Sequence, residues 1–125
     1  MRAALLAFLL LAAPAFAQDR APAERQTLGE LAVVLGEAHA LRVLCEGRGD
    51  QTWRNRMARV TELEQADQAF ANRLVDRFNE AYDYRLARHA RCDDAAKAEI
   101  RAVARRGRGI ASALSGGRLE TASAR

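Results

Sequence analysis

Two cysteines, Cys45 and Cys92, constrain the fold of this chain more than any other residues, because they are its only thiols. They lie far apart in the sequence, and neither a C-x-x-C redox pair nor a C-x-x-C-H haem site is present. Disulfides persist in oxidising compartments and are rare in the cytosol. The compartment in which the chain folds therefore decides whether a covalent cross-link is expected.

The N-terminus has the pattern of a secretory signal peptide. Met1 and Arg2 give a short positive start, residues 3–13 form an apolar run, and the sequence AFA at 15–17 is a small-x-small cleavage site. The apolar run is shorter than the roughly 20 residues that a membrane-spanning helix needs. No cysteine stands at the cleavage point to carry a lipid anchor. We therefore predict that residues 1–17 are a signal peptide, that the chain is periplasmic, and that no segment spans the membrane.

In an oxidising compartment, Cys45 and Cys92 are expected to form a disulfide. The loop that it closes is long enough for a stabilisation of about 4 kcal/mol. The two Cα atoms must then lie within about 7 Å of each other. One straight helix over residues 52–91 would be about 60 Å long and would keep the cysteines apart. The chain is therefore expected to turn back near residues 65–67, so that successive helices run in alternate directions.

Apolar residues recur at helical spacing through the rest of the chain, and no segment alternates as a strand would. Thr27 and Glu30 have the spacing of a capping box, which predicts that the first helix begins there and ends near Cys45. The second helix should begin near Thr52. Asp67 is placed to cap the third helix.

The third helix should reach about Arg91, Asp93 should cap the fourth, and the glycine pair at 116–117 should stop it. The predicted fold class is all-α, a small antiparallel bundle of about four helices with one disulfide. It comprises a flexible leader at 18–26, a helical domain at 27–115 and a flexible tail at 116–125. The residues expected to face the core of the four helices are Leu28, Leu31, Leu35 and Ala38; Trp53, Met57, Val60 and Leu63; Phe70, Leu74, Phe78, Ala81 and Tyr82; and Ala96, Ile100, Val103, Gly107, Ile110 and Leu114.

The first helix is apolar on more than one face, so we expect other helices to surround it on several sides. A second copy of the chain is an alternative cover for the same surface. Gly29 and Gly36 each cost about 1 kcal/mol in a helix, which a closely packed neighbour would offset. Arg42 falls inside the apolar stripe and is expected either to pair with a buried acid or to mark a contact surface.

The order and spacing of several short motifs resemble a known family. They are the run LGEAHALRVLC that ends at Cys45, the sequence WRNRM from Trp53, Phe78-Asn79, and Cys92. The family consists of small, exported, uncharacterised bacterial proteins of an alphaproteobacterial type with two well separated cysteines, and the resemblance covers most of residues 28–100. It implies a disulfide but no activity, and it carries no catalytic or binding residue to this chain.

A metal site is one alternative use of the cysteines. His89 and Cys92 have a spacing that lets two ligands share a helix face, and His39 with Cys45 would complete a set of four. However, His39 and Cys45 lie about 120° apart on an ideal helix, and oxidation would remove both thiolates. We therefore predict no metal and no cofactor. His89 is instead expected to finish the core beside Phe78 and Tyr82.

Residues for catalysis do not form a recognisable set. Glu30 and Glu37 are too far apart to share a proton, and they are expected to be a capping residue and a solvated or salt-bridged glutamate. Ser112 and Ser115 have no nucleophile motif around them. The sequence therefore predicts a protein that is not an enzyme.

Positive charge is organised on the fourth helix. The chain has a net charge of +4 with 20 basic residues, of which Lys97 alone is lysine, and such a bias can reflect genome composition as easily as a ligand. Lys97, Arg101, Arg105 and Arg108 nevertheless fall on one side of that helix, opposite its core line. We name these four residues the basic stripe, which is either an ordinary solvated face or a site for anionic lipid, lipopolysaccharide or an acidic protein surface.

These observations lead to a non-enzymatic periplasmic helical protein that acts through protein or cell-envelope contacts. The alternative is a binder of anionic envelope components through the basic stripe, and a metal protein is a remote third hypothesis. Export argues against nucleic acid as a partner. The oligomeric state and the identity of the partner do not follow from the sequence.

Overall fold

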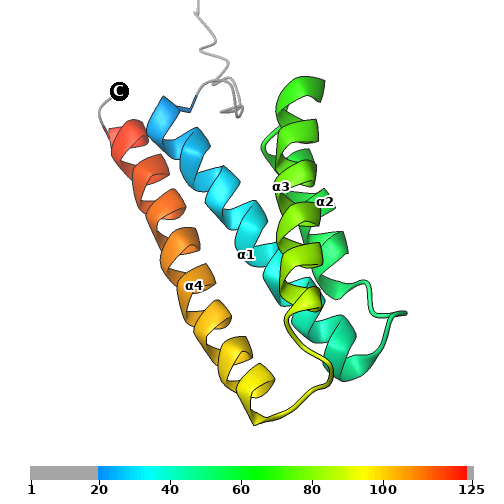
Figure 1. Cartoon of the computed structure of the whole chain (residues 1–125). Coiled ribbons are helices and arrows are strands. Elements are labelled where there is room, and N and C mark those ends of the chain that lie inside the picture. The colour runs from blue at the N-terminus through cyan, green and yellow to red at the C-terminus, as the bar shows by residue number, and fades with distance from the viewer. Residues whose placement is uncertain (1–19, 124–125) are drawn as a thin grey trace, which may run out of the picture.

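The computed structural model describes residues 20–123, with side chains over 20–116. Within that range it contains four α-helices and no strand: α1 (Pro22–Glu46), α2 (Thr52–Leu63), α3 (Gln68–Ala87) and α4 (Asp94–Ser123). Successive helices run in opposite directions (Figure 1). The predicted all-α antiparallel bundle is confirmed. The predicted signal peptide, residues 1–17, lies outside the described residues.

The first helix is the centre of the bundle. It packs against α2, α3 and α4, and α2 also packs against α3. The side chains of Leu28, Leu35, Met57, Leu74 and Phe78 are buried together in the main core, while Val34, Leu41, Ala96 and Val103 form a second core between α1 and α4. The expectation that several helices surround α1 is therefore confirmed. None of the described helices has the length and apolarity to cross a membrane.

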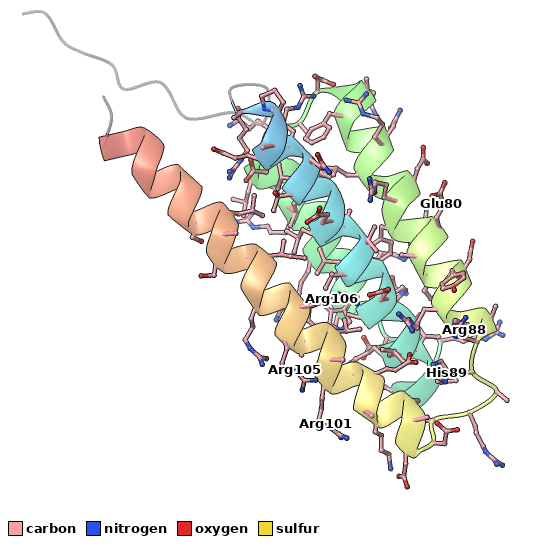
Figure 2. The ribbon with its side chains drawn as sticks, turned by 60° about the vertical axis from the view of Figure 1, so that its left-hand side comes forward. Glu80, Arg88, His89, Arg101, Arg105 and Arg106 are labelled. Atoms are coloured by element: carbon pink, nitrogen blue, oxygen red, sulfur yellow. A yellow bond between two sulfur atoms is a disulfide. The ribbon has the colours of Figure 1, made fainter. Side chains whose placement is uncertain are left out.

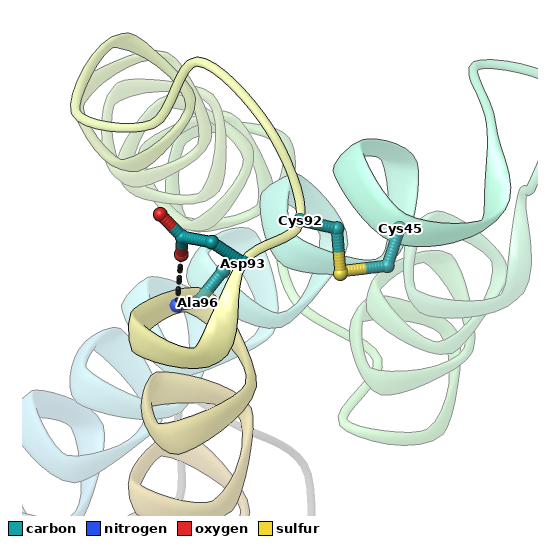
Figure 3. Close-up of a disulfide and its surroundings, with 4 residues drawn as sticks. All are labelled: Cys45, Cys92, Asp93 and Ala96. Carbon is teal, nitrogen blue, oxygen red and sulfur yellow. Dashed lines mark hydrogen bonds between the residues drawn. A yellow bond between two sulfur atoms is a disulfide. The ribbon is translucent and has the colours of Figure 1, made fainter.

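The predicted cross-link and the two predicted caps are present. Cys45 at the end of α1 is bonded to Cys92, with the two Cα atoms 5.1 Å apart. The side chain of Asp67 accepts a hydrogen bond from the Phe70 N–H over 2.8 Å and caps α3. Asp93, next to Cys92, accepts one from the Ala96 N–H over 2.9 Å and caps α4 (Figure 3). The bond and this cap together fix where α4 starts.

The start of α1 differs from the prediction. The helix begins at Pro22, where proline is favoured because its missing N–H would have no partner in the first turn. Thr27 therefore lies inside the helix, and its hydroxyl donates to the Ala23 carbonyl instead of forming a capping box. Arg20 is also held, because its guanidinium donates two hydrogen bonds to Glu64, over 2.6 and 2.8 Å. Residues 22–26 of the predicted leader are therefore part of α1.

Two helix ends also differ. The third helix ends at Ala87, four residues before Arg91, and α4 continues through the glycine pair to Ser123. Glycine costs about 1 kcal/mol per residue in a helix, which does not stop one that is already long, because extending an existing helix is far easier than nucleating it. Residues 116–123 of the predicted tail are therefore part of α4.

Two predicted core residues are exposed. Leu63 is 60% exposed at the end of α2, where its neighbour Glu64 turns inward to Arg20. Ile100 is 38% exposed and borders a groove described below. Helical spacing predicts the side of a helix correctly here, but it does not show where the neighbouring helix ends.

Gly36 allows the backbone of α3 to lie directly against α1, and no other described glycine has so close a neighbour. A Cβ atom built on Gly36 would lie 2.1 Å from the backbone oxygen of Phe78, whereas one on Gly29 would meet only the flexible side chain of Arg77, at 3.5 Å. The predicted close approach of a neighbouring helix is therefore present at Gly36, where α3 crosses α1.

We predict that Gly36→Ala destabilises the domain by about 2 kcal/mol, because α1 and α3 must separate to admit the methyl group. Gly109→Ala is the matched control, since a Cβ there meets nothing within 4 Å. That change should instead stabilise α4 by about 0.5–1 kcal/mol. Urea unfolding followed by circular dichroism measures both, and equal effects of the two variants would contradict the close contact.

Reduction of the disulfide should lower the free energy of unfolding by about 4 kcal/mol. Urea titrations with and without reductant give this difference directly. The double variant Cys45→Ser with Cys92→Ser is the control, and its stability should not respond to reductant. A wild-type transition that stays in place on reduction would show that the cross-link contributes little.

Candidate functional site

An apolar groove with a volume of about 640 Å³ lies over one side of α1, with α2 and α4 as its walls. Its floor is the face of α1 that carries Leu31, Ala38 and Cys45. Trp53 and Val60 line the α2 wall. The residues of the α4 wall are Ile100, Val103, Ala104, Gly107, Arg108 and Ala111. Its volume lies within the 300–1,000 Å³ that is usual for ligand pockets.

The groove exists because α2 and α4 flank α1 without closing over it. A Cβ on Gly107 would lie 3.1 Å from Val34, so α4 sits close against α1 at this point. Beyond that contact, Ala104 and Ala111 are too short to reach α2. The apolar residues of the floor therefore remain open on this side, although three helices cover the other sides of α1.

Arginines stand around the groove on all three helices. They are Arg42 of α1, Arg56 and Arg59 of α2, and Arg108 of α4, and we name them the arginine rim. Arg59 pairs with Glu62 over 3.1 Å, and the Arg56 guanidinium lies 4.9 Å from the centre of the Trp53 ring. The one acidic residue of the groove is Glu46, at the end of α1.

Arg42 has an acidic partner, as one of its two predicted roles requires, although that partner, Asp50, is only partly buried. Its side chain donates to the carboxylate of Asp50 over 2.9 Å, and it also lines the groove. The hydrogen bond from Arg42, together with one from the Thr52 N–H, lowers the pKa of Asp50 to about 2. Asp50 therefore keeps its charge in mild acid and holds Arg42 beside the start of α2.

A cluster of charged side chains lies on the opposite side of α4 from the groove. Glu37 of α1 is buried and accepts hydrogen bonds from Arg85 of α3, over 2.9 Å, and from Arg106 of α4. Arg85 also donates to Glu99 of α4 over 2.8 Å. Glu37 is thus the salt-bridged residue that the sequence allowed, and its two oxygens tie three helices together.

The two histidines lie in different surroundings, His89 beside a carboxylate and His39 among aromatic rings. His89 lies in the loop after α3, with its Nε2 atom 2.8 Å from Glu99 (Figure 2). That hydrogen bond lowers the pKa of Glu99, and the charge of Arg85 adds to the effect. His39 is the histidine of the core, stacked between Phe78 and Tyr82 at 5.6 and 4.9 Å, and burial lowers its pKa. The His89 side chain is 9% exposed, so it is buried near the end of α3 as predicted, but its partner is Glu99, and the rings of Phe78 and Tyr82 stack on His39 instead.

The proposed metal ligands do not come together as a set. Cys45 and Cys92 are joined to each other, so neither sulfur is a thiolate. Among the described side chains, no group of three or more histidine, cysteine or carboxylate residues is arranged to hold a metal ion. In the charged cluster both oxygens of Glu37 accept from arginines, and this arrangement fixes helices rather than freeing a base.

The four residues of the basic stripe, Lys97, Arg101, Arg105 and Arg108, are all exposed. Figure 2 shows that Arg101 and Arg105 point away from the bundle, whereas the neighbouring Arg106 turns toward it. Arg108 belongs to both the basic stripe and the arginine rim. The groove is not predicted from the sequence, because Ile100 and Gly107 are assigned to the core there. The spacing of Ile100, Ala104 and Ala111 is the sequence signal for the groove, since it places the three residues together along one edge of the core-facing side of the fourth helix.

Comparison with known proteins identifies a family but no described function. The sequence model of DUF2385, described as a protein of unknown function, matches residues 22–116, which is most of the chain. The match begins at the first residue of α1 and includes both cysteines and the groove. No curated protein and no solved structure matches the chain.

We predict that Glu37→Gln lowers the free energy of unfolding by about 2 kcal/mol, because the largely buried Arg85 loses one of its two charged partners and keeps only Glu99. Arg106→Gln should cost at most about 1 kcal/mol, since the Arg106 side chain is 51% exposed. Urea unfolding of the two variants measures the difference. Similar losses would mean that the exposed half of the cluster matters as much as the buried half.

Proposed function

The chain belongs to the DUF2385 family, and we propose that it is a non-enzymatic periplasmic protein that acts by binding a protein or envelope component in the groove between α2 and α4. The bacterial, alphaproteobacterial type of its relatives is part of the same proposal. The family is described as one of unknown function, so the support for the proposal comes from the residues of this chain.

The observation that carries the proposal is the open apolar floor of the groove. Leu31, Ala38 and Ile100 border a space that no described side chain of the chain fills. Contiguous apolar surface of this kind costs free energy in water and usually marks a contact site. A partner that covers the floor would remove that cost, so binding is the use that best fits this surface.

Two features support export. The N-terminal sequence has the charged start, apolar run and small-x-small site of a signal peptide. The disulfide between Cys45 and Cys92 is of a kind that persists in oxidising compartments. The two features are independent, because one lies in the predicted signal peptide and the other in the bundle, and both favour export.

The pairing of the buried charges supports a non-enzymatic role. A general base needs a carboxylate or imidazole that can take a proton from a bound substrate. Glu37 is held by two arginines, and Glu99 accepts from Arg85 and His89. These side chains also lie away from the groove, so they stabilise the bundle that carries it.

A second candidate function is the binding of anionic lipid or lipopolysaccharide by the basic stripe. Its specific support is that Lys97, Arg101, Arg105 and Arg108 are all exposed and that none has an ion pair with another described residue. Such cations can attract an anionic surface through long-range fields. This function would use the outer face of α4 and would not need the groove.

We predict that Ala104→Trp, which places a large ring in the groove, abolishes the capture of periplasmic partners by the tagged chain. Ala98→Trp is the matched control, because Ala98 is exposed on α4 and does not line the groove. Thermal unfolding should be alike in both variants, since neither residue is buried.

Capture followed by mass spectrometry, together with binding to phosphatidylglycerol vesicles, separates the two functions. Loss of partners in Ala104→Trp alone supports the groove. Equal capture by both variants contradicts it, and vesicle binding that disappears in Arg101→Gln with Arg105→Gln would favour the basic stripe.

A further inference from the structure

We propose that the occupant of the groove is an amphipathic helix of a partner protein, whose apolar stripe is flanked by aspartate and glutamate residues. This inference rests on the proposed function, because it names the partner chemistry for the same surface. It follows from three separate observations on the shape of the floor, the size of the wall residues and the position of the charges.

The floor has the form that a packed helix requires. Leu31, Ala38 and Cys45 lie seven residues apart in a single row along the open face of α1. Rows of this spacing are the seams along which helices pack at shallow angles. On its other sides, α1 already packs against α2, α3 and α4. A helix in the groove would complete the ring of neighbours around α1.

The walls leave room for a backbone rather than only for side chains. Along α4 the wall runs from Ile100 to Ala111, a length of about 17 Å or three helical turns. Three of its six residues, Ala104, Gly107 and Ala111, are small. Ala104 and Ala111, which are not packed as closely on α1 as Gly107 is, allow the axis of a second helix to come close. Trp53 on the opposite wall offers a broad apolar surface at one end.

The positive charges are spread along the groove and on both of its walls. Arg56 and Arg59 stand on α2, and Arg108 stands on α4. Gly107 lies beside Val34, so Arg108 is level with that part of α1, whereas Arg42 is two turns further along the helix, about 12 Å away.

This spread separates a helix from a lipid as the occupant. An amphiphile with a single anionic head would be matched by cations gathered at one end of the groove. An apolar stripe bordered by acids along its length matches cations on both walls, and opposite charges that face each other in this way direct both the register and the choice of partner.

A second copy of the chain fits the groove less well. It would bring the same arginine rim against itself, and the chain already carries a net charge of +4. Like charges brought together at a contact oppose it. An acidic helix from another protein can instead pair with Arg56 and Arg108, which have no ion pair with another described residue, while its apolar stripe covers the floor.

The test uses the oxidised chain and a synthetic probe, a 16-residue fluorescein-labelled helix with leucines at the first and fourth positions of each heptad and glutamates on both flanks. Binding is followed by fluorescence anisotropy at physiological salt. A second peptide, with lysines in place of the glutamates, has the same apolar stripe. The acidic peptide should bind at least about tenfold more tightly than the lysine peptide.

Matched variants locate the binding. Ala104→Trp should weaken the acidic peptide about tenfold or more, and Ala98→Trp should not. Arg56→Gln with Arg59→Gln should weaken it about fivefold. Arg101→Gln with Arg105→Gln removes the same charge from the outer face of α4 and should change binding less than about twofold.

Four outcomes would overturn the inference. The first three are equal binding of the two peptides, binding that Ala104→Trp leaves unchanged, and a dimer in analytical ultracentrifugation that Ala104→Trp abolishes. The fourth is binding of a lipid in place of the peptide. If oleate or phosphatidylglycerol vesicles bind in place of the peptide, and Ala104→Trp blocks them, the helix is rejected while the groove keeps its role. The proposed function itself fails only if capture of periplasmic partners is the same for Ala104→Trp and Ala98→Trp.

Discussion

The covalent bond between Cys45 and Cys92 is the constraint on which the arrangement of the bundle depends. It joins the end of α1 to the residue before the cap of α4, so α4 must begin beside the last turn of α1. The α2–α3 hairpin is closed within the same loop and packs on other sides of the central helix. One bond therefore decides that α4 returns along α1, and it reduces the freedom of the unfolded chain at the same time.

The charged cluster decides on which side of α1 the fourth helix rests. Glu37 draws in Arg106, and Arg85 of α3 holds Glu99, so that α4 is tied toward α3. No ion pair joins α4 to α2 among the described residues, and the wall that α4 turns toward α2 includes the small residues Ala104, Gly107 and Ala111. The groove and the cluster are thus two consequences of one placement, because helices pulled together on one side of α1 stay apart on the other.

Local signals predicted the parts of this structure that depend on local chemistry. Asp67 and Asp93 cap the helices that follow them, because the position of an acceptor before an apolar stripe is a property of a few neighbouring residues. The bundle followed from helical spacing and one cross-link. The start at Pro22 was missed because Thr27 and Glu30 imitate a capping box, and a proline at the first helical position was the stronger signal.

The groove could not be predicted in the same way, because it depends on how far two helices stand apart rather than on the pattern of either one. Ile100 has the spacing of a core residue and lies on the side of α4 that faces α1. It is nevertheless exposed at the edge of the groove, because no described helix covers it there. Cys45 also has two roles, because it forms the disulfide and ends the row of residues on the groove floor. The disulfide therefore joins the end of the groove floor to the start of α4, so that the shape of the groove and the stability of the fold depend on the same bond.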